Sequence, residues 1–172
     1  MITLSKQELE DITKGMKDPP PPQPLLFLPL IIGHTQVRAL LDSGASDSFI
    51  GEELVRGLGL ESYPLMQRLT VKVANGETLQ VTHFVKVAGR LGPMPVKLML
   101  RVIATTLPVV LGYTFVSRLN PHIDFRRRVL RIERHGRTFK IRALPTSESY
   151  SIGRTVATVK VMEKVREKVK PM

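Results

Sequence analysis

The fold of this chain is decided by Leu40-Leu41-Asp42-Ser43-Gly44-Ala45-Ser46-Asp47-Ser48-Phe49-Ile50. Two apolar residues precede an acid, and a short run of small polar residues separates it from a second apolar pair. Leu40 and Leu41 are expected to bury a strand end, which fixes where the Asp42 carboxylate points. Gly44 allows the backbone to approach that carboxylate and donate N–H groups to it. The stretch alone predicts a tight turn after a buried strand.

The residues around this turn are strand-like. Leu26 to Ile32 is an apolar run that ends at the turn signal Gly33-His34, and a second run from Gln36 leads into Asp42, so the two predict a hairpin. After the turn, the apolar spacing from Phe49 to Leu58 predicts a short helix.

Further strands follow at short intervals. The alternating residues Leu69–Val73, the hairpin signal Asn75-Gly76 and a return strand through Leu79, Val81, Val85 and Val87 predict a second hairpin, because Asn and Gly tolerate positive φ at both turn positions. Beyond it, the sequence predicts a turn at 89–95, strands at 96–103 and 107–111, a helix at 114–119, and a last hairpin formed by 129–132 and 138–144 with its turn at His135-Gly136. Many short strands with one or two small helices indicate an all-β, closed-barrel fold.

The two ends differ from this central part. Residues 4–17 are expected to form a short helix, with Ser5 and Glu8 at the capping-box spacing, and the proline run 19–24 is interpreted as an extended linker. The predicted division is therefore a segment of residues 1–24, a domain of residues 25–145 and a basic tail of residues 146–172. In the tail, Met162, Val165 and Val169 suit a helix face and residues 156–161 suit a strand, and a linker to a neighbouring domain is a third reading.

The composition limits the classes of function. The 172 residues contain no Cys, which excludes disulfides, cysteine nucleophiles and thiolate metal sites, and the four His residues lack ligand spacing, so neither a metal nor a cofactor is expected. No apolar run is long enough to span a membrane. The net charge of +11 is concentrated in residues 118–142, where nine Lys or Arg residues face two acids. That region is interpreted as a solvated strand surface, with weak nucleic-acid affinity as the alternative.

Asp42 is the one aspartate that precedes Ser-Gly or Thr-Gly; the others are Asp11, Asp18, Asp47 and Asp124. Hydrolysis by an aspartate pair needs two carboxylates that share one proton. A chain with one such motif must therefore obtain the second carboxylate from another copy, across a twofold axis.

Three further segments fit the same pattern: Val73-Ala74-Asn75-Gly76-Glu77, Val109-Val110-Leu111-Gly112, and Phe115 through Asn120-Pro121 to Phe125. With the Asp42 stretch, they resemble the protease domain of retroviruses and LTR retrotransposons, closest to the gypsy class. The resemblance covers roughly residues 26–144. It implies a single-lobe, retropepsin-like acid-protease barrel that forms a homodimer.

The resemblance also assigns roles to residues. Asp42 is the catalytic residue, and Ser43, Gly44 and Ala45 support the active-site loop: Ser43 offers a hydroxyl across the dimer interface, and Ala45 leaves space for substrate backbone. Ala74, Asn75 and Gly76 form the flap that closes over substrate. Val109–Gly112 is expected to pass behind the catalytic loop. Ser46 stands where retroviral enzymes commonly have Asp, and Asp47 is read as a turn cap or a substrate-orienting residue.

The resemblance implies an aspartic endopeptidase that processes a Gag-Pol-like polyprotein as a homodimer, and we expect it in the cytoplasm or within virus-like particles. The alternative is a domesticated, non-catalytic dimeric interaction module with the same fold. A basic nucleic-acid-binding protein that uses residues 118–142 is the third reading.

Overall fold

The computed structural model describes residues 3–15, 18–19, 23–73, 75–106, 108–145 and 161–166, the last of these as a backbone trace. In chain order, the elements are α1 (Lys6–Thr13), β1 (Phe27–Ile32), β2 (Thr35–Leu41), β3 (Phe49–Gly51), α2 (Glu52–Leu58), β4 (Ser62–Val73), β5 (Thr78–Leu91), β6 (Met94–Ile103), β7 (Val109–Leu111), α3 (Tyr113–Leu119), β8 (His122–Asp124), β9 (Val129–Arg134), β10 (Arg137–Arg142) and β11 (Val161–Arg166).

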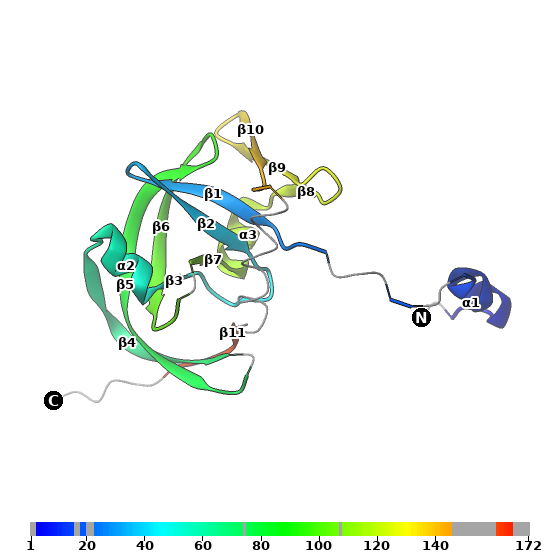
Figure 1. Cartoon of the computed structure of the whole chain (residues 1–172), viewed down its shortest axis with the longest axis horizontal. Helices are drawn as coiled ribbons and strands as arrows, with labels where there is room; N and C mark the ends of the chain where they lie inside the picture. Colours follow the sequence, from blue (N-terminus) through cyan, green and yellow to red (C-terminus); the bar gives the residue numbers. More distant parts are fainter. Residues whose placement is uncertain are drawn as a thin grey trace.

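One sheet closes on itself to form a barrel. Its strand order is β1-β2-β7-β3-β6-β5, and β1 pairs with β5 to complete the circle. The strand β4 continues the sheet beyond β5, and β11 lies beyond β4. In Figure 1 the barrel occupies the upper part of the domain, and the long β4–β5 hairpin curves below it. The predicted closed-barrel fold is therefore confirmed.

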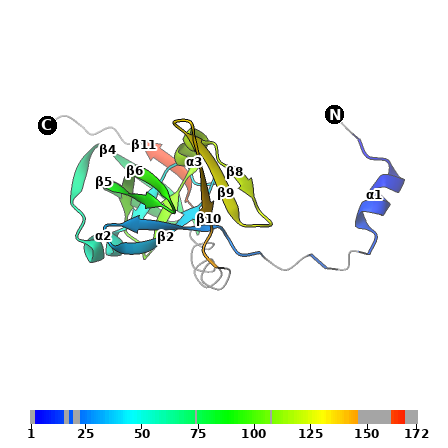
Figure 2. The ribbon, with the colours of Figure 1, turned by 90° about the horizontal axis from the view of Figure 1, so that it is seen from above.

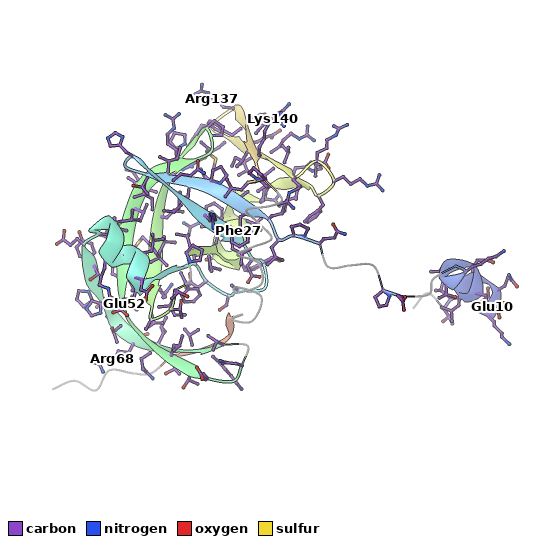
Figure 3. All side chains as sticks on the ribbon, in the orientation of Figure 1. Glu10, Phe27, Glu52, Arg68, Arg137 and Lys140 are labelled. Atoms are coloured by element: carbon purple, nitrogen blue, oxygen red, sulfur yellow. The ribbon has the colours of Figure 1, made fainter. Side chains whose placement is uncertain are left out.

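The barrel interior is filled by alternate residues of its strands. In β6 the side chains alternate between buried and exposed from Met94 to Leu100, as expected where one face of a strand packs on a core. The main core cluster includes Leu28 and Leu30 of β1, Leu100 of β6 and Leu111 of β7. Phe27 is also fully buried, and Figure 3 labels it within the body of the domain.

A second, three-stranded sheet has the order β10-β9-β8 and is fastened to the start of the domain. The Leu144 N–H donates to the Phe27 carbonyl at 2.7 Å, and the Arg128 guanidinium donates to the carbonyls of Pro24 and Leu25. Arg134 likewise donates to the Pro95 carbonyl. Arg137 and Lys140 extend outward from this sheet in Figure 3. Part of the basic excess of residues 118–142 is thus used for structural contacts, and the rest is solvated.

Several predicted boundaries change. Phe49–Gly51 is a strand, and the helix begins only at Glu52, because β3 pairs with both β6 and β7. The predicted turn at 89–95 shrinks to Gly92 and Pro93, since β5 and β6 stay paired as far as Leu91 and Met94. The short strand β8 was not predicted.

The N-terminal helix has the predicted capping box. The Glu8 N–H donates to Ser5 Oγ at 3.1 Å, and the Ser5 N–H donates to Glu8 Oε2 at 2.7 Å. None of the residues in α1 is buried, and in Figures 1 and 2 the helix lies apart from the barrel. The helix is shorter than the predicted 4–17.

The C-terminal residues Val161–Arg166 form the strand β11, antiparallel to β4. The helical reading of the tail is therefore wrong for these residues, because pairing with a distant strand outweighs the weak helical spacing of Met162 and Val165. Val169 and residues 156–160 lie outside the described residues.

Candidate active site

The loop that carries Asp42 begins where β2 ends. Ala39, Leu40 and Leu41 pair in parallel with Val109, Val110 and Leu111 of β7. The Asp42 N–H then donates to the Leu111 carbonyl at 3.0 Å, so the strand pairing extends to the acid itself. Asp42 is half-buried, with its backbone held by a strand whose side chains are fully buried or nearly so.

The side chain of Asp42 is oriented by its own loop. The Gly44 N–H donates to Asp42 Oδ1 at 2.9 Å, and the Ala45 N–H donates to the Asp42 carbonyl at 3.1 Å. Ser43 and Gly44 are exposed, whereas Ala45 is fully buried. The predicted donation from Gly44 is present, and the loop presents one carboxylate at the surface of a single chain.

Gly112 lies directly behind this loop. The Gly112 N–H donates to Ser48 Oγ at 3.0 Å, and the next N–H, that of Tyr113, donates to the Ala45 carbonyl at 2.7 Å. A Cβ on Gly112 would overlap the Asp47 carbonyl oxygen and would lie 2.8 Å from the Ala45 oxygen. As predicted, Val109–Gly112 passes behind the loop that carries Asp42, and only glycine fits at its end.

Asp47 anchors the far side of the loop. Asp47 is 7% exposed, and its carboxylate accepts the Ser48 N–H at 2.8 Å and forms an ion pair with the Arg101 guanidinium of β6. Thr114 Oγ1 of α3 donates to the same carboxylate at 3.3 Å. These contacts fit the turn-cap reading of Asp47, and the acid also ties the loop to β6 and α3.

Sequence reasoning did not identify Arg101 or Thr114. Arg101 stands at an outward position of the alternating strand β6, where a basic residue is ordinary. Its partner is 54 residues away in the chain, so no local pattern could have revealed it.

The β4–β5 hairpin has its turn at the predicted Asn75-Gly76. The Gly76 N–H donates to the Val73 carbonyl at 2.9 Å, the Val73 N–H donates to the Glu77 carbonyl at 3.0 Å, and Gly76 has φ of +88°. Asn75 Oδ1 accepts the Glu77 N–H at 2.9 Å. This hydrogen-bond pattern is typical of a three-residue loop that ends in a glycine bulge. Ala74 lies outside the described residues.

A second apolar cluster connects the hairpin with the loop. It joins Ala45 and Phe49, which flank the polar turn, to Leu69 and Val71 of β4 and Val81 of β5, together with Ile103 and Val110. The part of the hairpin near its tip is thus packed against residues of the loop that holds Asp42.

The described residues contain no group of three or more His, Cys, Asp or Glu side chains that could bind a metal ion. Within the same residues, no helix has the length and apolar character needed to cross a membrane.

The family model of the PEG10/RTL1 protease domain matches residues 38–138, which is more than half of the chain and includes the Asp42 loop, the hairpin and Gly112. The chain belongs to the PEG10/RTL1 protease domain family. No curated protein is similar enough in sequence to match it.

The chain is also similar in structure to solved proteins. The chain is similar to the retroviral protease-like domain of Ddi1 from Leishmania major, with a TM-score of 0.51 and 17% identity over 72% of this chain and 96% of that one. It is also similar to part of the foamy viral protease-reverse transcriptase in complex with an RNA/DNA hybrid, with a TM-score of 0.40 and 20% identity over 55% of this chain and 12% of that one. The first likeness confirms the retropepsin-like fold.

Proposed function

We propose that this protein is an aspartic endopeptidase to which each subunit of a homodimer contributes one Asp42 carboxylate. The observation that carries the proposal is the way in which hydrogen bonds hold the backbone and the carboxylate of Asp42 in place. Its backbone is bonded to β7, its carboxylate accepts the Gly44 N–H, and its loop is fixed from behind by Gly112. A functional group held this firmly at a half-exposed position is suited to chemistry that needs a defined direction.

The chemistry follows from placing two such carboxylates side by side. Two close carboxylates cannot both be ionised, so they share one proton. The charged carboxylate takes a proton from a water molecule that attacks the peptide carbonyl, and the protonated one donates a hydrogen bond to the carbonyl oxygen. Within the described residues, no Lys or Arg side chain forms an ion pair with Asp42, so the loop itself supplies no competing cation.

The exposure of residues at the tip of the Asp42 loop supports the proposal that a second chain completes the site. Ser43, Gly44 and Ser46 are exposed in the single chain, although they adjoin the buried residues Ala45 and Asp47. A twofold axis beside this exposed tip would bring the two Asp42 residues together in an isologous contact. Because Asp47 already pairs with Arg101 inside the same chain, the dimer contact would use other groups, of which the Ser43 hydroxyl is the nearest in sequence to Asp42.

The substrate in this proposal is an extended peptide that lies between the Asp42 loop and the β4–β5 hairpin. An extended peptide is recognised by main-chain hydrogen bonds to a strand edge, with side-chain pockets adding preference. The physiological substrate proposed from the resemblance is a Gag-Pol-like polyprotein, cleaved in the cytoplasm or in virus-like particles.

The deciding experiment is cleavage of a mixed library of peptides about ten residues long at mildly acidic pH, with Asp42→Asn as the test variant. Asp18→Asn is the matched control, because Asp18 is exposed and precedes the domain. Asp42→Asn should lose all measurable cleavage and Asp18→Asn should cleave as the wild type does. Equal cleavage by all three proteins would refute the mechanism.

Mixing the subunits tests the shared site. With a roughly threefold excess of Asp42→Asn chains and free exchange, activity per wild-type chain should fall to about one quarter, because most wild-type subunits then lie in mixed dimers. Undiminished activity per wild-type chain would mean that each chain works alone. If no protein cleaves any peptide but the chain dimerises, the non-catalytic interaction module is the better description.

A further inference from the structure

The outer edge of the hairpin strand β4 is occupied by this chain's own C-terminal residues. On one side, Leu69 to Lys72 pair with Val81 to Thr78 of β5. On the other side, Leu69 to Val73 pair with Arg166 to Val161 of β11, with one register shift between Val161 and Glu163. The backbone groups of β4 that face away from β5 therefore pair with β11, a strand that is not part of the closed barrel.

This edge belongs to the proposed substrate site. Leu69 and Val71 share an apolar cluster with Ala45 and Phe49, which flank the polar turn after Asp42. In the view of Figure 1, β11 lies between the β4–β5 hairpin and the loop that follows β2. An extended peptide that paired with the hairpin beside Asp42 would need the same edge.

The burial of Val73, at the tip of the hairpin, is also in keeping with occupation of this edge by β11. Val73 is only 3% exposed although it is the last residue of β4 before the turn. It belongs to neither of the two core clusters, and its register partner is Val161 of β11. β11 therefore runs beside an apolar residue that neither core cluster includes.

The connection is long enough to allow this arrangement within one chain. Residues 146–160 separate the last described residue of the domain from β11, and 15 residues can span up to about 50 Å. A short tether also gives a high effective concentration, in the millimolar range for flexible linkers. A segment that binds weakly as a free peptide can therefore occupy the edge when attached.

We propose that Val161–Arg166 is an intramolecular occupant of the substrate-strand position on β4, which competes with peptide substrates for the site. The proposal rests on the proposed protease function, because it concerns the regulation of the same site. It requires no covalent step: substrate binds when β11 detaches from the edge of β4.

The test variant is the full-length double substitution Lys164→Pro/Val165→Pro. Successive residues of a strand direct their N–H groups to opposite sides, so two adjacent prolines remove a donor toward β4 whichever residue supplies it. The control is Val169→Pro, which adds a proline to the tail outside the residues paired with β4.

The first measurement, which does not depend on catalysis, is hydrogen exchange of those backbone amides in residues 69–73 that point away from β5. Exchange there should be faster by at least about tenfold in the double variant than in the wild type or the Val169→Pro control. Equal exchange in all three proteins would overturn the proposal. Protection that rises with protein concentration would also overturn it, because the strand would then come from a second copy.

The second measurement is peptide cleavage. The double variant should show a KM several-fold lower at unchanged kcat, and a synthetic peptide of residues 158–169 should inhibit it competitively. An unchanged KM together with no inhibition by the peptide would count against competition for the site. If no variant cleaves peptides but the exchange difference is present, the occupied edge stands and the proposed protease function fails.

Discussion

Arg101 on β6 pairs with the carboxylate of Asp47, five residues after Asp42, and so fastens the Asp42 loop to the barrel. The Arg101 N–H also donates to the Ser48 carbonyl at 3.1 Å, so side chain and backbone hold adjacent residues of the loop. The Asp47 side chain is nearly buried, whereas the Arg101 side chain is only partly buried. The ion pair is therefore desolvated mainly at its carboxylate.

A double-mutant cycle tests this anchor. Asp47→Asn and Arg101→Met should each lower the free energy of unfolding by about 2 kcal/mol, less than for a fully buried pair because the Arg101 side chain is partly solvated. The double variant should lose clearly less than the sum of the two, measured by urea denaturation. Strictly additive losses would show that the two residues do not stabilise each other.

Gly112 offers a sharper steric test. Gly112→Ala should lower the free energy of unfolding by several kcal/mol, since its Cβ would meet two backbone carbonyls that cannot move without displacing the Asp42 loop. Gly57→Ala is the matched control, because Gly57 lies in α2 with open space around its Cβ. That change should stabilise the protein by up to about 1 kcal/mol. Thermal unfolding compares the two, and equal melting temperatures would contradict the close approach.

Substitutions of Ser48 and Ser46 compare a residue that supports the Asp42 loop with a residue on the surface of that loop. Ser48→Ala removes the buried acceptor of the Gly112 N–H and should cost about 1–3 kcal/mol of unfolding free energy. Ser46→Ala, at an exposed position two residues earlier, should change it by less than about 0.5 kcal/mol. Urea denaturation gives both values, and a larger loss at Ser46 would place the support elsewhere.

The N-terminal helix should respond to acid. The backbone N–H of Ser5, followed by its hydroxyl, lowers the pKa of Glu8 by bonding to the carboxylate. Because the pKa is lower in the folded helix, the capping contribution is complete above the usual pKa of a glutamate and disappears as the pH falls through the lowered value. NMR chemical shifts of residues 6–9 should show the helix weakening over this acidic range. Glu8→Gln should remove the pH dependence, and an identical acid transition in that variant would assign it to another group.

The parts of the site that could be predicted are those encoded locally or by the family pattern. The acid, the glycine two residues later and the Leu-Gly segment behind the loop all lie where the sequence analysis placed them. A capping box such as that of Ser5 and Glu8 also depends only on residues three apart.

The parts that could not be predicted depend on contacts between distant strands. Phe49–Gly51 has helical spacing but becomes a strand because β6 and β7 lie on either side of it. The tail residues Val161–Arg166 become a strand only because the edge of β4 is available. Arg101 gains its role from a partner that no local pattern reveals.

The strand β7 lies between β2 and β3, although both precede it in the chain by the whole length of the hairpin. During synthesis, Asp42 therefore leaves the ribosome long before the Leu111 carbonyl that accepts its N–H. Until the chain has extended past Gly112, the acid is attached to an unfinished barrel with no fixed direction. The order of synthesis thus delays assembly of the Asp42 loop, so a nascent or prematurely terminated chain carries the Asp-Ser-Gly residues without the geometry on which the proposed activity depends.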